Sequence, residues 1–281
     1  MRIATVRQRL CLIQAGGAID VQAASDGRFG PDAAAIYPRW AEFTEWAASA
    51  ALPGPQPYAN EDLGSPSPSP RQVFGIGLNY SDHVAESGFD KPDTLPPVFT
   101  KFPSCITGPY CDITLPDGGH TDWEVELAVI IGTTAHEVPA ATAWEYVAGL
   151  SVGQDVSERI LQMATKPPQF SMGKSYPRFG PVGPWLVTTD EFDNPDDLEL
   201  GCRVNGEQMQ KARTSQLIFG VPELIEQLSR VTPLLPGDVI FTGTPSGVGL
   251  GRTPQRWLQP GEVLTSYIEG IGEMRHTFVA A

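Results

Sequence analysis

The clearest alternation of apolar and polar residues lies in the segment TDWEVELAVIIG, at positions 121–132. Residues two apart in a β-strand share a face, with Cα atoms roughly 6.5–7 Å apart. The alternation predicts a strand with an apolar face and, opposite it, the neighbouring side chains Glu124 and Glu126. Two like charges held side by side next to a core repel each other, and burial raises that cost. The strand therefore needs something that stabilises its two carboxylates.

Strand patterns dominate the rest of the chain. Runs bounded by Gly or Pro predict strands at 73–80, 125–132, 184–189, 198–207, 238–244 and 262–272. Helical patterns are fewer, and they predict helices at 221–231 and 141–150, with helical composition also at 40–52. Strands and helices do not alternate regularly, so a doubly wound sheet is disfavoured. The pattern favours an α+β fold with a mixed, mainly antiparallel β architecture and flanking helices.

A proline-rich stretch divides the chain. Six prolines lie between positions 53 and 70, in PGPQPYANEDLGSPSPSP, and such a run can be neither a helix nor a central strand. We therefore expect a small N-terminal module at 1–70, which ends in this connector at 53–70. The main, catalytic domain is expected at 71–281.

Composition narrows the class of protein. The chain has 281 residues, of which 41% are hydrophobic and 19% charged, as in a folded soluble protein. Its formal net charge of −14 disfavours nucleic acids and anionic membranes as partners. No stretch approaches the ~18 consecutive apolar residues of a membrane span. The first residues lack the apolar region of a secretory signal, and the four cysteines show no metal-ligand spacing, so we expect a cytoplasmic protein.

A bound divalent cation is one explanation for the paired glutamates. Carboxylate oxygens suit hard ions such as Mg²⁺, Mn²⁺ or Ca²⁺, and Asp155 in SVGQDVSERI offers a third carboxylate. The spacing alone fits equally well with Glu124 and Glu126 on an exposed strand face and Asp155 as a helix N-cap. The glycine-rich stretch GTPSGVGLG lacks the Gly-Lys-Ser/Thr of a phosphate-binding loop, which disfavours a nucleotide cofactor.

A histidine and a glutamate form a second candidate group. In GLNYSDHVAESGFDKP, His83 and Glu86 are three residues apart and would share one face of a short helix. An imidazole that is oriented by a carboxylate is a general base able to activate water.

Seven motifs in order resemble the fumarylacetoacetate hydrolase family. They are GLNYSDHVAE, DWEVELAVIIG, DVSERILQ, GKSYPRFGPVGPW, VNGE, PGDVIFTGTPSGVG and GIGEM, between about Val73 and Gly272. The resemblance is to the bacterial branch with acylpyruvate hydrolases, oxaloacetate decarboxylases and the hydratases or isomerases of aromatic catabolism. It implies a β-sandwich or β-roll, a homodimer, and one Mg²⁺ or Mn²⁺ per subunit, for which Ca²⁺ would be a substitute.

The resemblance also implies roles for single residues. The family's metal ligands fall on Glu124, Glu126 and Asp155, and its catalytic groups fall on His83, Glu86 and Lys174. Its substrate-side residues fall on Arg159, Gln162 and Thr244, whereas Tyr80 and Tyr176 fit ligand contacts and core aromatics equally well. The chain departs from the family's common residues at Gln154, Glu158 and 176–178, which affects the pocket but neither the metal ligands nor the His–Glu pair.

Together these features predict a metal-dependent hydrolase. It would cleave a C–C bond in a dicarbonyl compound, such as an acylpyruvate or fumarylpyruvate, with water activated by His83 and Glu86 and an enolate stabilised by the metal. The alternative is a lyase or isomerase acting on a 2-oxo acid: an oxaloacetate decarboxylase, a 2-oxo-enoate hydratase or a keto–enol tautomerase. A binding protein without activity is disfavoured, because every catalytic position keeps its residue.

Overall fold

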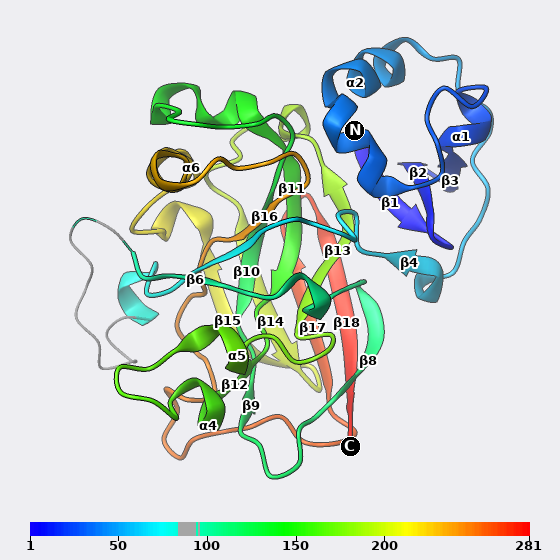
Figure 1. Cartoon of the computed structure of the whole chain (residues 1–281). Helices are drawn as coiled ribbons and strands as arrows, with labels where there is room; N and C mark the ends of the chain where they lie inside the picture. The colour runs from blue at the N-terminus through cyan, green and yellow to red at the C-terminus, as the bar shows by residue number, and fades with distance from the viewer. Residues whose placement is uncertain (84–93, 95) are drawn as a thin grey trace.

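A computed structural model describes residues 1–83, 94 and 96–281, and two β-sheets dominate it (Figure 1). The larger, eleven-stranded sheet follows the order β3 (Gly17–Asp20), β2 (Arg9–Gln14), β1 (Arg2–Val6), β13 (Gly180–Val187), β11 (Val147–Gln154), β10 (Val125–Ile131), β16 (Val239–Phe241), β5 (Val73–Ile76) and β6 (Val98–Thr100), with β4 (Leu63–Gly64) and β7 (Ile106–Thr107) beside it. The five-stranded sheet follows the order β15 (Glu207–Arg213), β14 (Glu199–Val204), β17 (Val263–Ile268), β18 (Gly272–Val279) and β8 (Tyr110–Thr114).

Short elements complete the described chain. A two-stranded sheet joins β9 (Thr121–Asp122) to β12 (Ser157–Glu158). The α-helices are α1 (Val21–Ala24), α2 (Trp40–Ser49), α4 (Arg159–Gln162), α5 (Phe170–Gly173) and α6 (Val221–Val231). The 3₁₀ helices are η1 (Ala33–Arg39), η2 (Asn60–Asp62), η3 (Pro103–Cys105), η4 (Ala140–Tyr146), η5 (Thr189–Glu191) and η6 (Thr214–Gln216). No helix among the described residues is long and apolar enough to span a bilayer.

The predicted fold class is confirmed. Most neighbouring strands are antiparallel, but β16–β5, β13–β7 and β18–β8 are parallel, so both large sheets are mixed. Helix α6 covers the predicted segment, and β10, β14, β16 and β17 lie within predicted strands.

The helix predicted at 141–150 is wrong in its second part. Residues Ala140–Tyr146 form a 3₁₀ helix, and the chain then enters β11, which pairs with β10. All eight residues of β11 are buried, because its two faces are both covered. A strand that is buried on both sides shows no alternation of apolar and polar residues, so its pattern could not be distinguished from that of a buried helix.

Strand β10 separates two hydrophobic clusters. Val125, Leu127 and Val129 point into the core between the two large sheets. Ala128 and Ile130 point to the opposite side, into a cluster shared with N-terminal side chains such as Ile3, Leu10 and Phe43. The side chains that alternate along this strand therefore contact two different hydrophobic clusters, one on each face.

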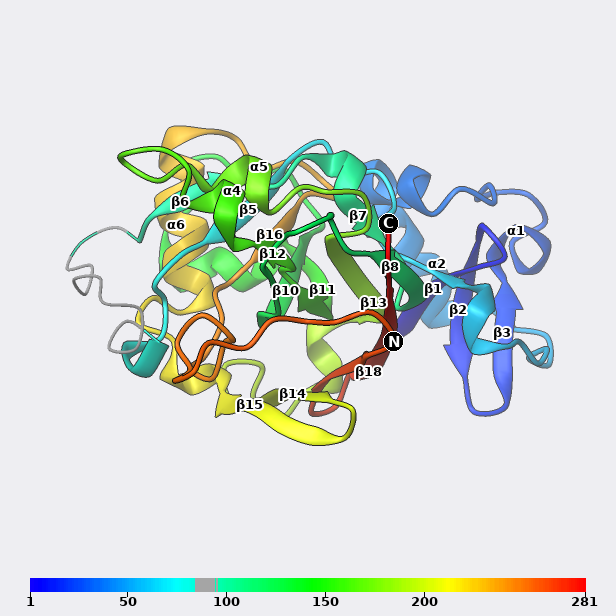
Figure 2. The same ribbon diagram turned by 90° about the horizontal axis from the view of Figure 1, so that it is seen from below.

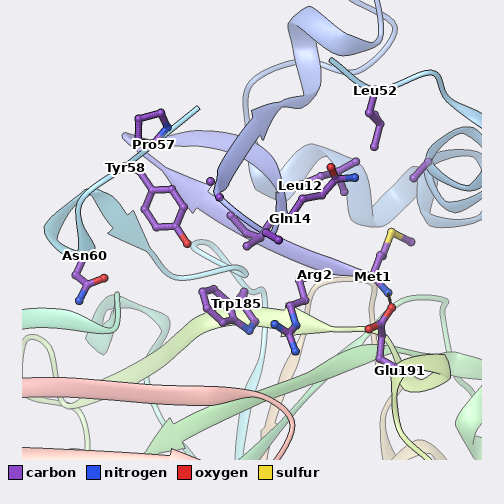
Figure 3. Close-up of a pocket in the computed structure, with 15 residues that line it drawn as sticks. Met1, Arg2, Leu12, Gln14, Leu52, Pro57, Tyr58, Asn60, Trp185 and Glu191 are labelled. Atoms are coloured by element: carbon purple, nitrogen blue, oxygen red, sulfur yellow. Dashed lines mark hydrogen bonds and ion pairs between the residues drawn. The ribbon is translucent and has the colours of Figure 1, made fainter. Parts of the chain in front are cut away.

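The expected N-terminal module continues the main sheet. β1 pairs with β13 through Arg2↔Val187 and Ile3↔Leu186, so strands from 1–70 and 71–281 hydrogen-bond directly (Figures 1 and 2). A cleft of about 770 Å³ opens at this junction, between Leu12, Tyr58 and Trp185 (Figure 3). The division of the chain at residue 70 stays a prediction.

Candidate active site

The register of two central strands brings three carboxylates together. Val125 pairs with Gln154, and the backbone N–H of Asp155 donates to the Glu124 carbonyl at 2.9 Å. Glu124, Glu126 and Asp155 each present an oxygen, and these atoms lie within 4.8 Å of one another. All three side chains are at least 93% buried, so the exposed strand face allowed by the spacing is excluded.

Lys174 joins two of these carboxylates. Its Nζ donates to Glu124 Oε2 at 2.8 Å, to Asp155 Oδ2 at 2.7 Å and to Ser157 Oγ at 2.8 Å. The lysine reaches them from the end of α5 and is 2% exposed. Three acceptors in fixed directions hold the ammonium group in one place.

The charges of the cluster shift its pKa values in opposite directions. Burial acts to raise the pKa of Glu124, but the positive charges of Lys174 and Arg159 outweigh it and hold that pKa at about 2. Burial and the negative charges of Asp155 and Glu124 raise the pKa of Glu126 well above its ordinary value. Burial acts to lower the pKa of Lys174, yet Asp155 and Glu124 leave it raised. Lys174 is thus an ammonium, and Glu126 bears the negative charge that this site stabilises least.

Arg159 reaches the cluster from α4. Its Nη1 lies 2.7 Å from Glu124 Oε1 and donates to Gln162 Oε1 at 2.8 Å. Its Nε and Nη2 donate to Asp122 Oδ2 at 2.9 and 2.7 Å. Glu158, the neighbouring carboxylate, instead accepts from the backbone N–H groups of Ile160 and Leu161 and so caps α4. Arg159 therefore pairs with Asp122 and Glu124.

A second buried lysine lies on the opposite side of Asp155. Lys101 Nζ donates to Asp155 Oδ1 at 2.6 Å and also to the backbone carbonyl of Lys174. Lys101 is 0% exposed. Each oxygen of Asp155 thus accepts from a different ammonium group.

The glycine-rich segment after β16 closes the other side. The backbone N–H of Gly243 donates to Glu126 Oε2 at 2.7 Å. Thr244 Oγ1 donates to the Val125 carbonyl at 2.9 Å and accepts from Gln210 Nε2 at 2.8 Å. The stretch that fails as a phosphate-binding loop therefore positions a carboxylate and lines the site.

A pocket reaches the carboxylate cluster at Glu124. Its polar lining includes His83, Glu124, Arg159, Gln162, Lys174 and Thr244. Phe99, Phe170 and Met163 contribute apolar surface to the same pocket. Predicted catalytic and substrate-side residues that are up to 161 positions apart thus share one pocket. Glu86 lies outside the described residues, so its pairing with His83 stays a prediction.

The two predicted tyrosines do not line this pocket. Tyr80 is 2% exposed and lines a separate cavity with Lys211 and Gln216. Tyr176 packs against Phe179, with ring centroids 5.2 Å apart, at the edge of the core. In the described structure both side chains behave as core aromatics, and their contact with substrate remains a prediction.

Three residues of the site, Asp122, Lys101 and Ser157, were not predicted from the sequence. Asp122 stands two positions before Glu124, so the same alternation that identified the glutamates would have extended to it. Lys101 and Ser157 carry no such signal, because each is a single polar residue whose partners are distant in sequence.

The cluster fits a hard divalent cation. Its candidate ligands are oxygen atoms only and are buried, and burial together with the neighbouring carboxylates raises the pKa of one of them, Glu126. Among the described residues, four buried carboxylates (with Asp122) face three buried cations, Lys101, Lys174 and Arg159. This excess of one negative charge favours a bound cation.

A family model for the fumarylacetoacetate (FAA) hydrolase C-terminal domain matches residues 72–279, which include every one of these groups. The chain belongs to the fumarylacetoacetate hydrolase family. Bovine mitochondrial oxaloacetate tautomerase FAHD2A is 44% identical over 209 residues, 74% of this chain and 66% of that protein. Members of this family and its structural neighbours are enzymes: hydrolases, isomerases and tautomerases.

Solved structures of the family share the whole fold. A Mycobacterium smegmatis protein named for HpcE is 54% identical, with a TM-score of 0.97 and full coverage of both chains. Maleylpyruvate hydrolase from Sphingobium sp. SYK-6, in complex with manganese(II) ion and pyruvate, is 27% identical, with a TM-score of 0.78 and full coverage of both chains.

Proposed function

We propose that this protein is a divalent-cation-dependent hydrolase that cleaves a C–C bond in an acylpyruvate or a related dicarbonyl compound. The observation that carries the proposal is the buried cluster of Glu124, Glu126 and Asp155, because Glu124 lines a pocket that Lys174 and His83 also line. A family member that hydrolyses maleylpyruvate and was crystallised with manganese(II) and pyruvate supports it.

Each residue has a defined part in this reaction. Glu124, Glu126 and Asp155 would hold Mg²⁺ or Mn²⁺, which supplies Lewis-acid stabilisation of the enolate. His83 takes a proton from water, and the hydroxide adds to the distal carbonyl carbon. The Lys174 ammonium stabilises the oxyanion that forms there. Collapse of this adduct breaks the C–C bond and releases a carboxylic acid and the enolate of a 2-oxo acid, which takes up a proton. Gln162 and Arg159 orient the substrate's carboxylate.

The direct test is a substrate screen with the purified protein. Loss of enol absorbance of acylpyruvates and fumarylpyruvate should require Mg²⁺ or Mn²⁺ and stop with chelator. His83→Ala should lower kcat by roughly 10²–10⁴, the range for general base catalysis, while the variant binds the cation as wild type does. Full hydrolysis by metal-free protein, or by the His83 variant, would overturn the proposal.

Tautomerisation of a 2-oxo acid is the second candidate, because the bovine relative of 44% identity is an oxaloacetate tautomerase. That reaction needs enolisation but no water as nucleophile. Two results together would favour the tautomerase. His83→Ala would still convert enol oxaloacetate to the keto form, and wild type would hydrolyse no acylpyruvate. A homodimer, a cytoplasmic location and a place in aromatic catabolism belong to the same proposal, as does Ca²⁺ as a substitute ion.

A further inference from the structure

Six buried side chains around the pocket form one chain of alternating charge. Its members, in order of contact, are Asp122, Arg159, Glu124, Lys174, Asp155 and Lys101. The five closest ion-pair distances lie between 2.6 and 2.8 Å, and no side chain in the chain is more than 7% exposed. Because the charges are desolvated, each pair influences the next, and a change at one end reaches the other members.

Asp122 anchors one end of this charge chain. It is 0% exposed, and its two oxygens accept from the backbone N–H groups of Trp123, Gly249 and Leu250 in addition to Arg159. Every partner is a donor, which requires an ionised carboxylate rather than an amide or an acid. Asp122 holds Arg159 through two hydrogen bonds and, like Glu124, balances part of its charge.

This anchoring bears on the carboxylate cluster through Glu124. Both of its oxygens are engaged, Oε1 by Arg159 and Oε2 by Lys174. A cation at the cluster must therefore share Glu124 with Arg159. The more of the guanidinium charge that Asp122 balances, the less Arg159 competes for Glu124, so the negative charge of Asp122 favours the cation.

Lys101 has the opposite effect at the other end. It engages Asp155 Oδ1 while Lys174 engages Oδ2, and no second carboxylate among the described residues balances its charge. Lys101 therefore competes with a cation for Asp155 and also repels it.

We propose that Asp122 and Lys101 are paired positioning residues that set the affinity of the site for its cation in opposite directions, although neither belongs to the carboxylate cluster itself. This inference rests on the proposed cation site. Residues that merely stabilise the fold would behave differently, because the loss of either one would weaken cation binding. The proposal instead predicts weaker binding when Asp122 loses its charge and tighter binding when Lys101 does.

Calorimetric titration of metal-free protein with Mg²⁺ and with Mn²⁺ tests the pair without reference to turnover. Asp122→Asn keeps the shape but removes the charge, and it should weaken binding by about 10–100-fold, the effect of losing a residue that orients metal ligands. Asp122→Glu keeps the charge and should recover most of that loss. Lys101→Met should tighten binding by about tenfold, near the lower end of the same range.

Asp238→Asn is the matched control. Asp238 is also 0% exposed and accepts from the backbone N–H groups of Gln72 and Leu235, but it lies at the far end of β16. This variant should lose stability and keep the wild-type affinity for the cation. Thermal unfolding shows which variants fold. If Asp122→Asn does not fold, near-wild-type affinity in Asp122→Glu together with tighter binding in Lys101→Met still supports the pair, and weaker binding in Lys101→Met contradicts it.

The outcomes separate this inference from the function on which it rests. If wild-type protein binds no divalent cation, the proposed function and this inference both fail. If wild type binds the cation but Asp122→Asn binds as tightly as wild type, or Lys101→Met also binds more weakly, only the assignment of the pair fails.

Discussion

His276 illustrates how a single buried group ties stability to pH. The residue lies in β18 with 0% exposure; its Nε2 is 3.1 Å from the Gly108 carbonyl, and its Nδ1 has no partner among the described residues. Burial disfavours the charged imidazolium and lowers the pKa to about 4, despite the opposing hydrogen bond to Gly108. The folded protein therefore keeps this histidine neutral at a pH where the unfolded chain, with a pKa near ~6.5, becomes protonated.

The sign of the resulting pH dependence follows from proton uptake. Between about pH 6.5 and 4 the unfolded chain binds more protons than the folded protein, so stability falls as the pH falls through that window, by roughly 3 kcal/mol in total for this group. We expect His276→Gln to lose less stability than wild type between pH 7 and pH 4.5, as measured by urea unfolding. Equal losses in the two proteins would show that His276 does not contribute.

At the scale of elements, α4 and α5 can approach each other closely because residue 173 is glycine and has no side chain. A Cβ on Gly173 would lie 2.8 Å from both the backbone N of Gln162 and the backbone O of Glu158. Backbone atoms cannot move aside as the end of a flexible side chain does. This close approach places Arg159 and Gln162 of α4 in the same pocket as Lys174, which follows Gly173.

Gly173→Ala should therefore separate the two helices. We expect a loss of stability of roughly 1–3 kcal/mol, as for other overpacked sites, and a fall in kcat/KM of up to about 10²-fold from the misplaced groups. Gly30→Ala is the control, because a Cβ there would meet nothing within 4 Å. Thermal unfolding and steady-state kinetics of both variants measure the effect; wild-type kinetics in Gly173→Ala would contradict it.

The elements also show what a sequence can and cannot predict. The amphipathic pattern located α6, and alternation located β10 with Glu124 and Glu126, because both signals are local. The helix predicted at 141–150 ran into the first residues of β11, because burial on both faces of that strand removes the alternation. The contact of Lys101 with Asp155 joins residues 54 apart, and no periodicity records such a pairing.

At the scale of the whole molecule, one core cluster contains residues from both expected units. Ile3 and Phe43 of the N-terminal module pack in the same cluster as Ile130 and Phe241 of the central strands. The hydrogen bonds between β1 and β13 reinforce this contact. Separation of the module would expose the face of β10 opposite the core between the sheets.

We therefore expect residues 1–70 and 71–281 to unfold together. Differential scanning calorimetry should show one transition, and fluorescence of Trp40 and Trp46 in the module should change at the same temperature as circular dichroism of the sheets. A first transition seen only by these two tryptophans would show instead that the module unfolds on its own.

The depth of the carboxylate cluster has a kinetic consequence. Every residue of β10 and β11 is buried, and each strand is hydrogen-bonded to a neighbour on both edges. A cation that leaves the cluster would have to exchange each carboxylate oxygen for water, and the pocket that reaches Glu124 is lined in part by Phe99, Phe170 and Met163. The residence time of the ion would therefore be governed by rehydration through this partly apolar pocket, and much less by the strength of the sheet that carries its ligands.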